Sequence, residues 1–215
     1  MSSERYETIT VQFWRDRIAA ALRDGIPDPV RTGVSRSSSE EQMIFDERSR
    51  SILANHIAPG SRVLDIGCGW GYLVPFLPED THYLGIDFVP EFICEAITSW
   101  WGRPHTDFML ADVLLPETLG QFANASRDAV LGRGIEGTLY LEPSSQRTLT
   151  FDAAVGRWIE ATIGAAAGAE VWERVVTDLV RIAGKLLLFS PQHVAPKVWE
   201  MLDNRLVVTQ DYRDA

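Results

Sequence analysis

Residues Val63–Gly71, with the sequence VLDIGCGWG, decide the fold. A short apolar run that contains Asp65 leads into glycines at positions 67, 69 and 71. The apolar run predicts a buried strand, and glycine lets the following turn adopt positive φ and bring backbone N–H groups close to a ligand, where a Cβ would collide. A helix beginning just beyond the turn would add the positive end of its dipole. The stretch therefore predicts a nucleotide-binding turn in an α/β sheet.

The spacing of the glycines separates two kinds of nucleotide site. A dinucleotide-binding turn, G-x-G-x-x-G, would need a glycine where this chain has Tyr72, and the pattern here is D-x-G-x-G-x-G. Asp87, at the end of the strand-like run HYLGIDF, is a second signal, because an acid there can accept hydrogen bonds from the two hydroxyls of a ribose. A glycine turn without a ligand is the alternative, and Asp87 argues against it.

These residues resemble motif I of the class I S-adenosylmethionine (SAM) methyltransferases, which carry an acid two residues before the first glycine. The resemblance covers roughly residues 60 to 190 and is specific for the SAM-binding half. It implies SAM as the cofactor. It also implies a turn, Gly67, Cys68, Gly69 and Gly71 with Asp65 before it, that packs on the methionine and ribose parts of SAM.

Further site residues follow from the same resemblance. Asp87 would hold the ribose diol, Phe88 would stack near the adenine, and Asp112 and Val113 would read the adenine edge. Phe88 could also be an ordinary core residue. Arg133 could bind the SAM carboxylate through its planar guanidinium, or pair with an acid such as Glu136 on the surface.

The order of elements predicts an α/β fold: a doubly wound, mostly parallel sheet with helices on both faces, as in the Rossmann-like methyltransferases. Relative to that family, helices are added at the N-terminus and the C-terminal hairpin looks trimmed. The expected strands are 62–66, 82–86, 107–111, 185–189 and 206–209. The expected core helices begin at 72 and 90 and span 169–182 and 196–202.

An amphipathic helix, Val11–Leu22, and a second helix at about 40–54 precede the core. They either close over a bound ligand or pack on the sheet, and the residues do not separate these alternatives. We therefore expect an N-terminal helical cap at 1–58 and a SAM-binding domain at 59–215.

The fourth strand has two candidates. Residues 128–139 and 152–163 match at seven of twelve positions. The number of residues between Asp112 and Asp128 suits a crossover helix that leads to the first copy. In the second copy the apolar residues recur with the period of a helix. We place the strand at Ala129–Gly132 and expect an insertion at about 140–165.

The expected catalytic residues follow the fourth and fifth strands. They are Glu136 and His193. His193 could act as a general base, since histidine has an unperturbed pKa of about 6.5, or could be merely exposed. Methyl transfer needs mainly positioning and desolvation, so a weak catalytic motif does not exclude an enzyme.

Composition narrows the partners and the compartment. Net charge is −10 and the pI about 4.9, with no basic stripe, so we expect a small-molecule substrate and no nucleic acid. Neither a signal peptide nor 18 consecutive apolar residues is present, which predicts a cytoplasmic protein without membrane contact. Two isolated cysteines suggest neither disulfides nor a metal site. A monomer or a homodimer is expected.

Three functions remain open from the sequence. The first is a SAM-dependent methyltransferase acting on a small molecule, for instance in secondary metabolism. The second is a methyltransferase-like enzyme that cyclises SAM itself to a small-ring amino acid and releases methylthioadenosine. The third is an inactive partner subunit with the same fold.

Overall fold

The computed structural model describes most of the first 133 residues and short segments after them. The described residues are 3–32, 39–113, 115–124, 126–133, 174, 175, 177–179, 181, 182, 185–189, 197–202 and 205–211. The expected insertion at 140–165 and the second repeat copy lie outside them. The chain divides into two compact units. One consists of Met1–Gly60 and Cys68–Asp112, and the other of Ser61–Gly67 and Val113–Ala215. The expected boundary near residue 58 stays a prediction.

The strands follow the order of a doubly wound sheet. The order is β3-β2-β1-β4-β5-β6-β7, in which β2 and β3 are parallel, as are β1, β4 and β5. The expected α/β fold is confirmed. The strand bounds are β1 Arg62–Ile66, β2 His82–Asp87, β3 Thr106–Leu110, β4 Ala129–Arg133, β5 Lys185–Phe189, β6 Lys197–Leu202 and β7 Arg205–Asp211.

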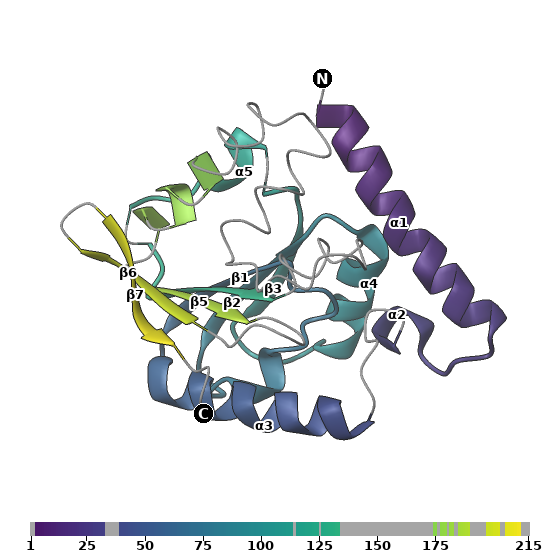
Figure 1. The fold of residues 1–215 in the computed structure, drawn as a ribbon, viewed down its shortest axis with the longest axis horizontal. Coiled ribbons are helices and arrows are strands. Elements are labelled where there is room, and N and C mark those ends of the chain that lie inside the picture. The colour runs from purple at the N-terminus through teal and green to yellow at the C-terminus, as the bar shows by residue number, and fades with distance from the viewer. Residues whose placement is uncertain are drawn as a thin grey trace. The chain divides into compact units, whose positions relative to one another are not determined.

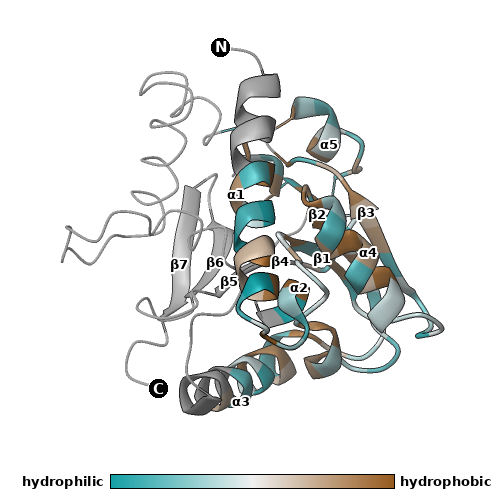
Figure 2. Cartoon of the chain, turned by 90° about the vertical axis from the view of Figure 1, so that its right-hand side faces the viewer, coloured by the Kyte–Doolittle hydropathy of each residue, from teal (hydrophilic) through white to brown (hydrophobic). Residues whose placement is uncertain are grey.

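The first unit holds most of the described helices. They are α1 Ser3–Arg23, α2 Pro29–Thr32, α3 Ser39–His56 and α4 Pro90–Ser99, together with the 3-10 turn η1 Val74–Phe76. Pro90 begins α4 as expected, since its missing N–H would lack a helical partner there in any case. The apolar face of α4, with Phe92, Ile93 and Ala96 buried, packs on β2 and β3. Figure 2 shows these three elements rich in hydrophobic residues.

The expected helix after the glycine turn is wrong. Only the single 3-10 turn η1 forms between β1 and β2, with Pro75 in its first turn and Leu77 already extended. Fifteen residues separate Ile66 from His82, and Pro78 interrupts them as well. Because a proline in a helix interior removes a hydrogen bond and clashes with the preceding turn, the segment cannot extend into an α-helix. The turn therefore has no long helix to lend it a dipole.

The second unit contains β1, β4, β5, β6 and β7 and the short helix α5 Pro116–Gly120 (Figure 1). The strand placed at Ala129–Gly132 is confirmed as β4, whose residues pair in parallel with β1 from Val63↔Ala129 to Ile66↔Gly132. Only the first of the two repeat copies is therefore assigned to this strand. The expected helix at 196–202 is wrong: this segment is β6, which pairs antiparallel with β5 and with β7. The described part of 169–182 is helical, as expected.

Buried strand positions explain why the apolar runs become the core. In β1, Val63, Leu64 and Ile66 are fully buried, as is typical of a parallel strand covered on both faces. Burying each such side chain contributes about 1.5–3 kcal/mol to the free energy of unfolding.

Within the described ranges, no helix combines the length and the apolar character needed to cross a bilayer.

Candidate cofactor site

The glycine turn has the backbone conformation that its sequence predicts. Gly67, Gly69 and Gly71 have φ of 67°, 55° and 77°, a region that residues with a Cβ rarely adopt. The amide of Cys68 donates to the Ile86 carbonyl at 3.1 Å, which ties the turn to β2. The Gly71 amide donates to the Cys68 carbonyl at 2.9 Å and closes the turn.

Gly71 and Gly69 differ in what an added side chain would meet. A Cβ on Gly71 would lie 2.6 Å from Nε1 of Trp100, so the packing of a tryptophan demands this glycine. A Cβ on Gly69 would meet nothing within 4 Å. The open space beside the turn is therefore at Gly69, and this is the position at which a ligand can approach the backbone.

Cys68 fills a space between the turn and β2. Its side chain is buried, and its Sγ lies 2.8 Å from the place that a Cβ on Gly85 would occupy. Gly85 is thus a glycine because the turn packs against β2 at this point. Sequence reasoning missed it, although an isolated glycine inside a strand is a known signal for close backbone approach. A packing role for Cys68 agrees with this geometry.

Asp87 joins the end of β2 to the turn. Its Oδ2 accepts a hydrogen bond from the Gly69 amide at 2.9 Å, and its Oδ1 accepts one from the Val89 amide at 2.9 Å. Burial raises the pKa of Asp87 to about 6, against the opposing effect of the backbone amides of Val89, Gly69 and Phe88. Each carboxylate oxygen has a second lone pair, so the group can still accept from a ligand hydroxyl.

Asp112 lies in the same neighbourhood. Its side chain is buried, and its charge contributes to raising the pKa of Asp87. Phe88, which follows Asp87, is half-buried, unlike a residue wholly enclosed in the core. The first unit thus brings Gly69, Asp87 and Asp112 together, with Phe88 next to Asp87 in the sequence.

Four other expected cofactor residues belong to the second unit. Asp65 is fully buried in β1, where it pairs in register with Leu131. Gly67 begins the turn, and Val113 directly follows Asp112 and is half-buried. Arg133 ends β4, opposite Phe189 of β5. The expected catalytic residues Glu136 and His193 lie outside the described residues.

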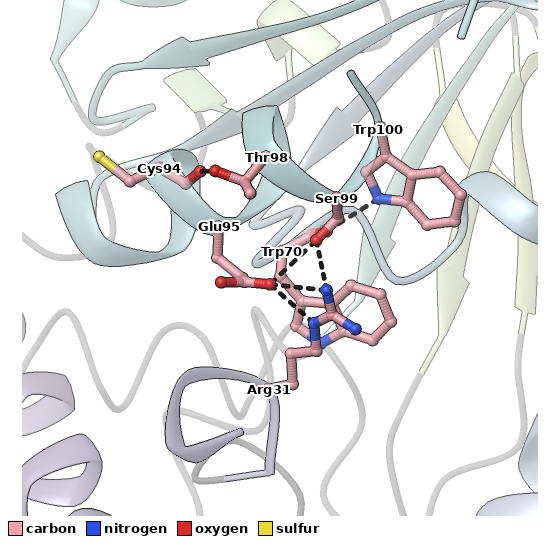
Figure 3. Close-up of polar contacts among 7 residues, drawn as sticks. All are labelled: Arg31, Trp70, Cys94, Glu95, Thr98, Ser99 and Trp100. Carbon is pink, nitrogen blue, oxygen red and sulfur yellow. Dashed lines mark hydrogen bonds and ion pairs between the residues drawn. The ribbon is translucent and has the colours of Figure 1, made fainter. Parts of the chain in front are cut away.

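Sequence reasoning missed an aromatic and ionic cluster around Trp70, the residue between Gly69 and Gly71. Figure 3 shows the Arg31 guanidinium beside Glu95 and Ser99 of α4 and next to the Trp70 ring. Trp100 lies parallel to Trp70. The sequence did hold a signal for this contact. Glu91, Glu95 and Ser99 are spaced four residues apart and therefore form one polar face of α4 that an arginine can contact.

Among the described side chains, no group of three or more His, Cys, Asp or Glu residues could hold a metal ion. A buried carboxylate bonded to the turn suits the paired hydroxyls of a ribose. The open space at Gly69 suits close contact between ligand and backbone. The arrangement can therefore hold a nucleoside.

Comparisons with known proteins agree with this architecture. The profile of a family described as "Methionine biosynthesis protein MetW" matches residues 48–107, which include the turn and Asp87. A search of curated proteins found no match. Among solved structures, Haemonchus contortus phosphoethanolamine N-methyltransferase 1, in complex with phosphoethanolamine and S-adenosylhomocysteine, has a TM-score of 0.54 and 17% identity, covering 100% of this chain and 37% of its own.

A second similar structure is the N-methyltransferase NodS from Bradyrhizobium japonicum WM9 in complex with S-adenosylhomocysteine. It has a TM-score of 0.51 and 18% identity, and covers 83% of this chain and 71% of its own. The bifunctional kinase-methyltransferase WbdD matches at a TM-score of 0.43 and 15% identity, over 75% of this chain. The chain spans 31% of the WbdD chain and 50% of the Bacillus YcgJ chain. The first two likenesses show that the chain has the Rossmann-like methyltransferase fold.

Proposed function

We propose that this chain binds SAM at the glycine turn and Asp87 and transfers its methyl group to a small-molecule acceptor. The observation that carries the proposal is the hydrogen bond from the Gly69 amide to the buried Asp87 carboxylate, which joins the two halves of a nucleoside site. The fold is the second support, because two proteins that share it are N-methyltransferases in complex with S-adenosylhomocysteine.

Each residue of the site has a defined task in this proposal. Asp87 accepts hydrogen bonds from the two ribose hydroxyls, and Gly69 leaves room for the ligand beside the backbone. Asp112 and the Val113 amide recognise the adenine edge, Phe88 stacks on its ring, and Arg133 binds the amino-acid carboxylate.

SAM supplies an activated methyl group on a sulfonium, so the protein's main contributions are in-line positioning and exclusion of water. A base is needed only where the acceptor must lose a proton. Glu136 and His193 are the residues that we propose for that step. The net charge of −10 supports a small-molecule acceptor over a nucleic acid, and we place that acceptor in secondary metabolism.

Isothermal titration with SAM and with S-adenosylhomocysteine tests the proposal directly. We expect saturable binding of both, with a Kd within the span that is typical of enzyme KM values, about 1 μM to 1 mM. Absence of heat with either ligand at millimolar concentration would refute SAM binding.

A second measurement separates methyl transfer from cyclisation of SAM. The protein is incubated with SAM alone, and the products are followed by mass spectrometry. Methylthioadenosine above the spontaneous rate would contradict the proposal and favour the cyclising reaction. A cell extract that supplies candidate acceptors is then added. If S-adenosylhomocysteine forms only after this addition, the result supports methyl transfer.

A further inference from the structure

Arg31 of α2 makes a set of contacts that fix the position of its guanidinium. Its Nε donates to Oε1 of Glu95 at 2.8 Å, and its Nη2 donates to Oγ of Ser99 at 2.8 Å. Ser99 in turn donates to Glu95 at 3.0 Å. Glu95 and Ser99 lie one turn apart on α4, so the guanidinium is held by two points of one helix (Figure 3).

The held guanidinium lies against Trp70. Its central carbon is 5.1 Å from the centroid of the Trp70 ring, within the range of a cation–π contact. The Trp70 ring also stacks on Trp100, at 6.4 Å between centroids and 6° between planes. The Trp70 carbonyl accepts a hydrogen bond from Nε1 of Trp100 at 3.0 Å. Both the ring and the backbone of Trp70 are therefore anchored.

Trp70 is the only residue between Gly69 and Gly71 in the sequence, so fixing it fixes the turn on both sides. Glycines at positive φ gain little from their own conformational preferences and lose more entropy on folding than other residues. A turn with three such glycines must be held in shape by contacts with its surroundings, and Trp70 provides them.

We propose that Arg31 is a positioning residue for the cofactor turn, which acts through Trp70 and thereby couples the N-terminal segment to the affinity for the adenosyl ligand. The inference rests on the proposed function for the identity of that ligand. Arginine suits the role because its planar guanidinium can stack on an aromatic ring while it forms hydrogen bonds at its edge, which a lysine ammonium cannot do.

Arg15 offers a matched control. It pairs with Glu91 at 2.6 Å, one turn before Glu95 on the same helix, and its exposure of 47% is close to the 40% of Arg31. Arg15→Ala thus removes an ion pair between the N-terminal segment and α4, while the contact of Arg31 with Trp70 is kept. Arg31→Ala removes both an ion pair and the ring contact.

The experiment compares Arg31→Ala, Arg31→Lys and Arg15→Ala with the unchanged protein. Amide hydrogen exchange is measured without ligand at Gly69 and Gly71, whose N–H groups bond to Asp87 and Cys68. The Kd for S-adenosylhomocysteine is measured by titration. We expect Arg31→Ala to speed exchange at both amides and to raise Kd by about tenfold, as loss of a partly buried cation–π contact would do. Arg15→Ala should change either quantity by less than about twofold.

Arg31→Lys keeps the charge near Glu95 but loses the planar contact, so it should fall between the two alanine variants. It also carries the test if Arg31→Ala fails to fold, as judged by thermal melting. Equal exchange and equal Kd in the Arg31 and Arg15 variants would overturn the inference. If the unchanged protein binds no S-adenosylhomocysteine, the proposed function fails, and the exchange rates alone then decide whether Arg31 holds the turn.

Discussion

At the scale of the residue, the pKa values of two aspartates are shifted in opposite directions, each for an identifiable reason. Burial raises the pKa of Asp87 to about 6. Hydrogen bonds from the Arg62 side chain lower the pKa of Asp128. Between about pH 4 and pH 6, Asp87 therefore binds more protons in the folded protein than in the unfolded protein. Near the usual pKa of an aspartate, Asp128 binds fewer protons in the folded protein than in the unfolded protein.

The raised pKa of Asp87 predicts that stability and affinity change in opposite senses with pH. As the pH rises from about 4 to 6, the buried carboxyl group ionises, so its contribution to the free energy of unfolding falls by about 2 kcal/mol. The ionised group is the better acceptor for ribose hydroxyls, so the affinity for S-adenosylhomocysteine should rise about tenfold between pH 5 and pH 7. Urea unfolding and titration across this range measure the two trends.

Asp87→Asn serves as the control. The amide cannot ionise, so both trends attributable to residue 87 should disappear. Its NH₂ group must also face one of the two backbone amides that now donate to Asp87, which should weaken the turn at every pH. A pH dependence of affinity that persists in this variant would contradict the role of Asp87.

Alanine substitutions at three glycines separate the effects of backbone strain, of packing and of ligand contact. Gly69, Gly71 and Gly102 all have positive φ, and only at Gly71 would a Cβ collide with a neighbour. Alanine at Gly102 should cost about 1 kcal/mol of stability, the penalty of the left-handed backbone. Alanine at Gly71 should cost about 1–3 kcal/mol more because of Trp100. Alanine at Gly69 should resemble Gly102→Ala in stability but lose at least about tenfold in affinity for S-adenosylhomocysteine.

Denaturant midpoints and titrations measure these three variants. Equal affinity in Gly69→Ala and Gly102→Ala would show that no ligand contacts the turn at Gly69. The sequence predicted the positive φ of the turn, because the spacing of the glycines requires it. It could not predict that Gly71 accommodates Trp100, since that contact joins residues 29 positions apart.

At the scale of the element, the strands were predicted better than the helices. Strands β1 and β5 contain short runs rich in apolar residues, VLDI and LLLF, that the sequence shows directly. The expected helix after Gly71 fails because its prolines leave room only for η1. The segment 196–202 forms β6 because it pairs with β5 along the edge of the sheet. This tertiary pairing overrides the helical pattern of its sequence.

An ion pair at the start of β1 and β4 offers a test at this scale. Arg62 donates from its side chain to Asp128, at 2.9 Å for the Nη2–Oδ1 pair, and its backbone amide donates to Oδ2 at 2.8 Å. Both side chains are about half exposed, so Asp128→Asn should lower the free energy of unfolding at pH 7 by only about 1 kcal/mol.

The sign of the pH dependence checks the mechanism behind that loss. Asp128 has a lowered pKa in the folded protein, so its contribution is present above about pH 4 and is lost as the pH falls further. The difference in stability between the unchanged protein and Asp128→Asn should therefore shrink in acid. Asp107→Asn, at an exposed aspartate of β3, is the surface control, and it should change the urea midpoint at pH 7 less than Asp128→Asn does.

At the scale of the whole molecule, charge restricts the partners. With a net charge of −10, the chain should not bind duplex DNA or RNA, because such binding depends on neutralising phosphates with lysine and arginine. Fluorescence anisotropy with labelled duplexes at about 50 mM salt should show no binding at micromolar protein. Binding that weakens steeply with added salt would reveal a basic surface that the overall charge conceals.

The overall fold could be predicted because one motif and the order of elements suffice to select it. For the candidate site, Gly69, Asp87 and Asp112 lie near one another. That these residues bind SAM stays a prediction. The cluster of Arg31, Trp70 and Trp100 could not be predicted, since it depends on how α2 packs against α4. No local periodicity encodes that packing.

The stack of Trp70 on Trp100 has an optical consequence. Two indoles at 6.4 Å and nearly parallel share their excited states, and one of them is part of the glycine turn. Any event that shifts the turn changes the distance between the rings, and with it the near-ultraviolet circular dichroism and the emission of the pair. A ligand that moves the turn should therefore change the near-ultraviolet circular dichroism of this pair, and titration with S-adenosylhomocysteine can be followed in this way without a dye or a radioactive methyl group.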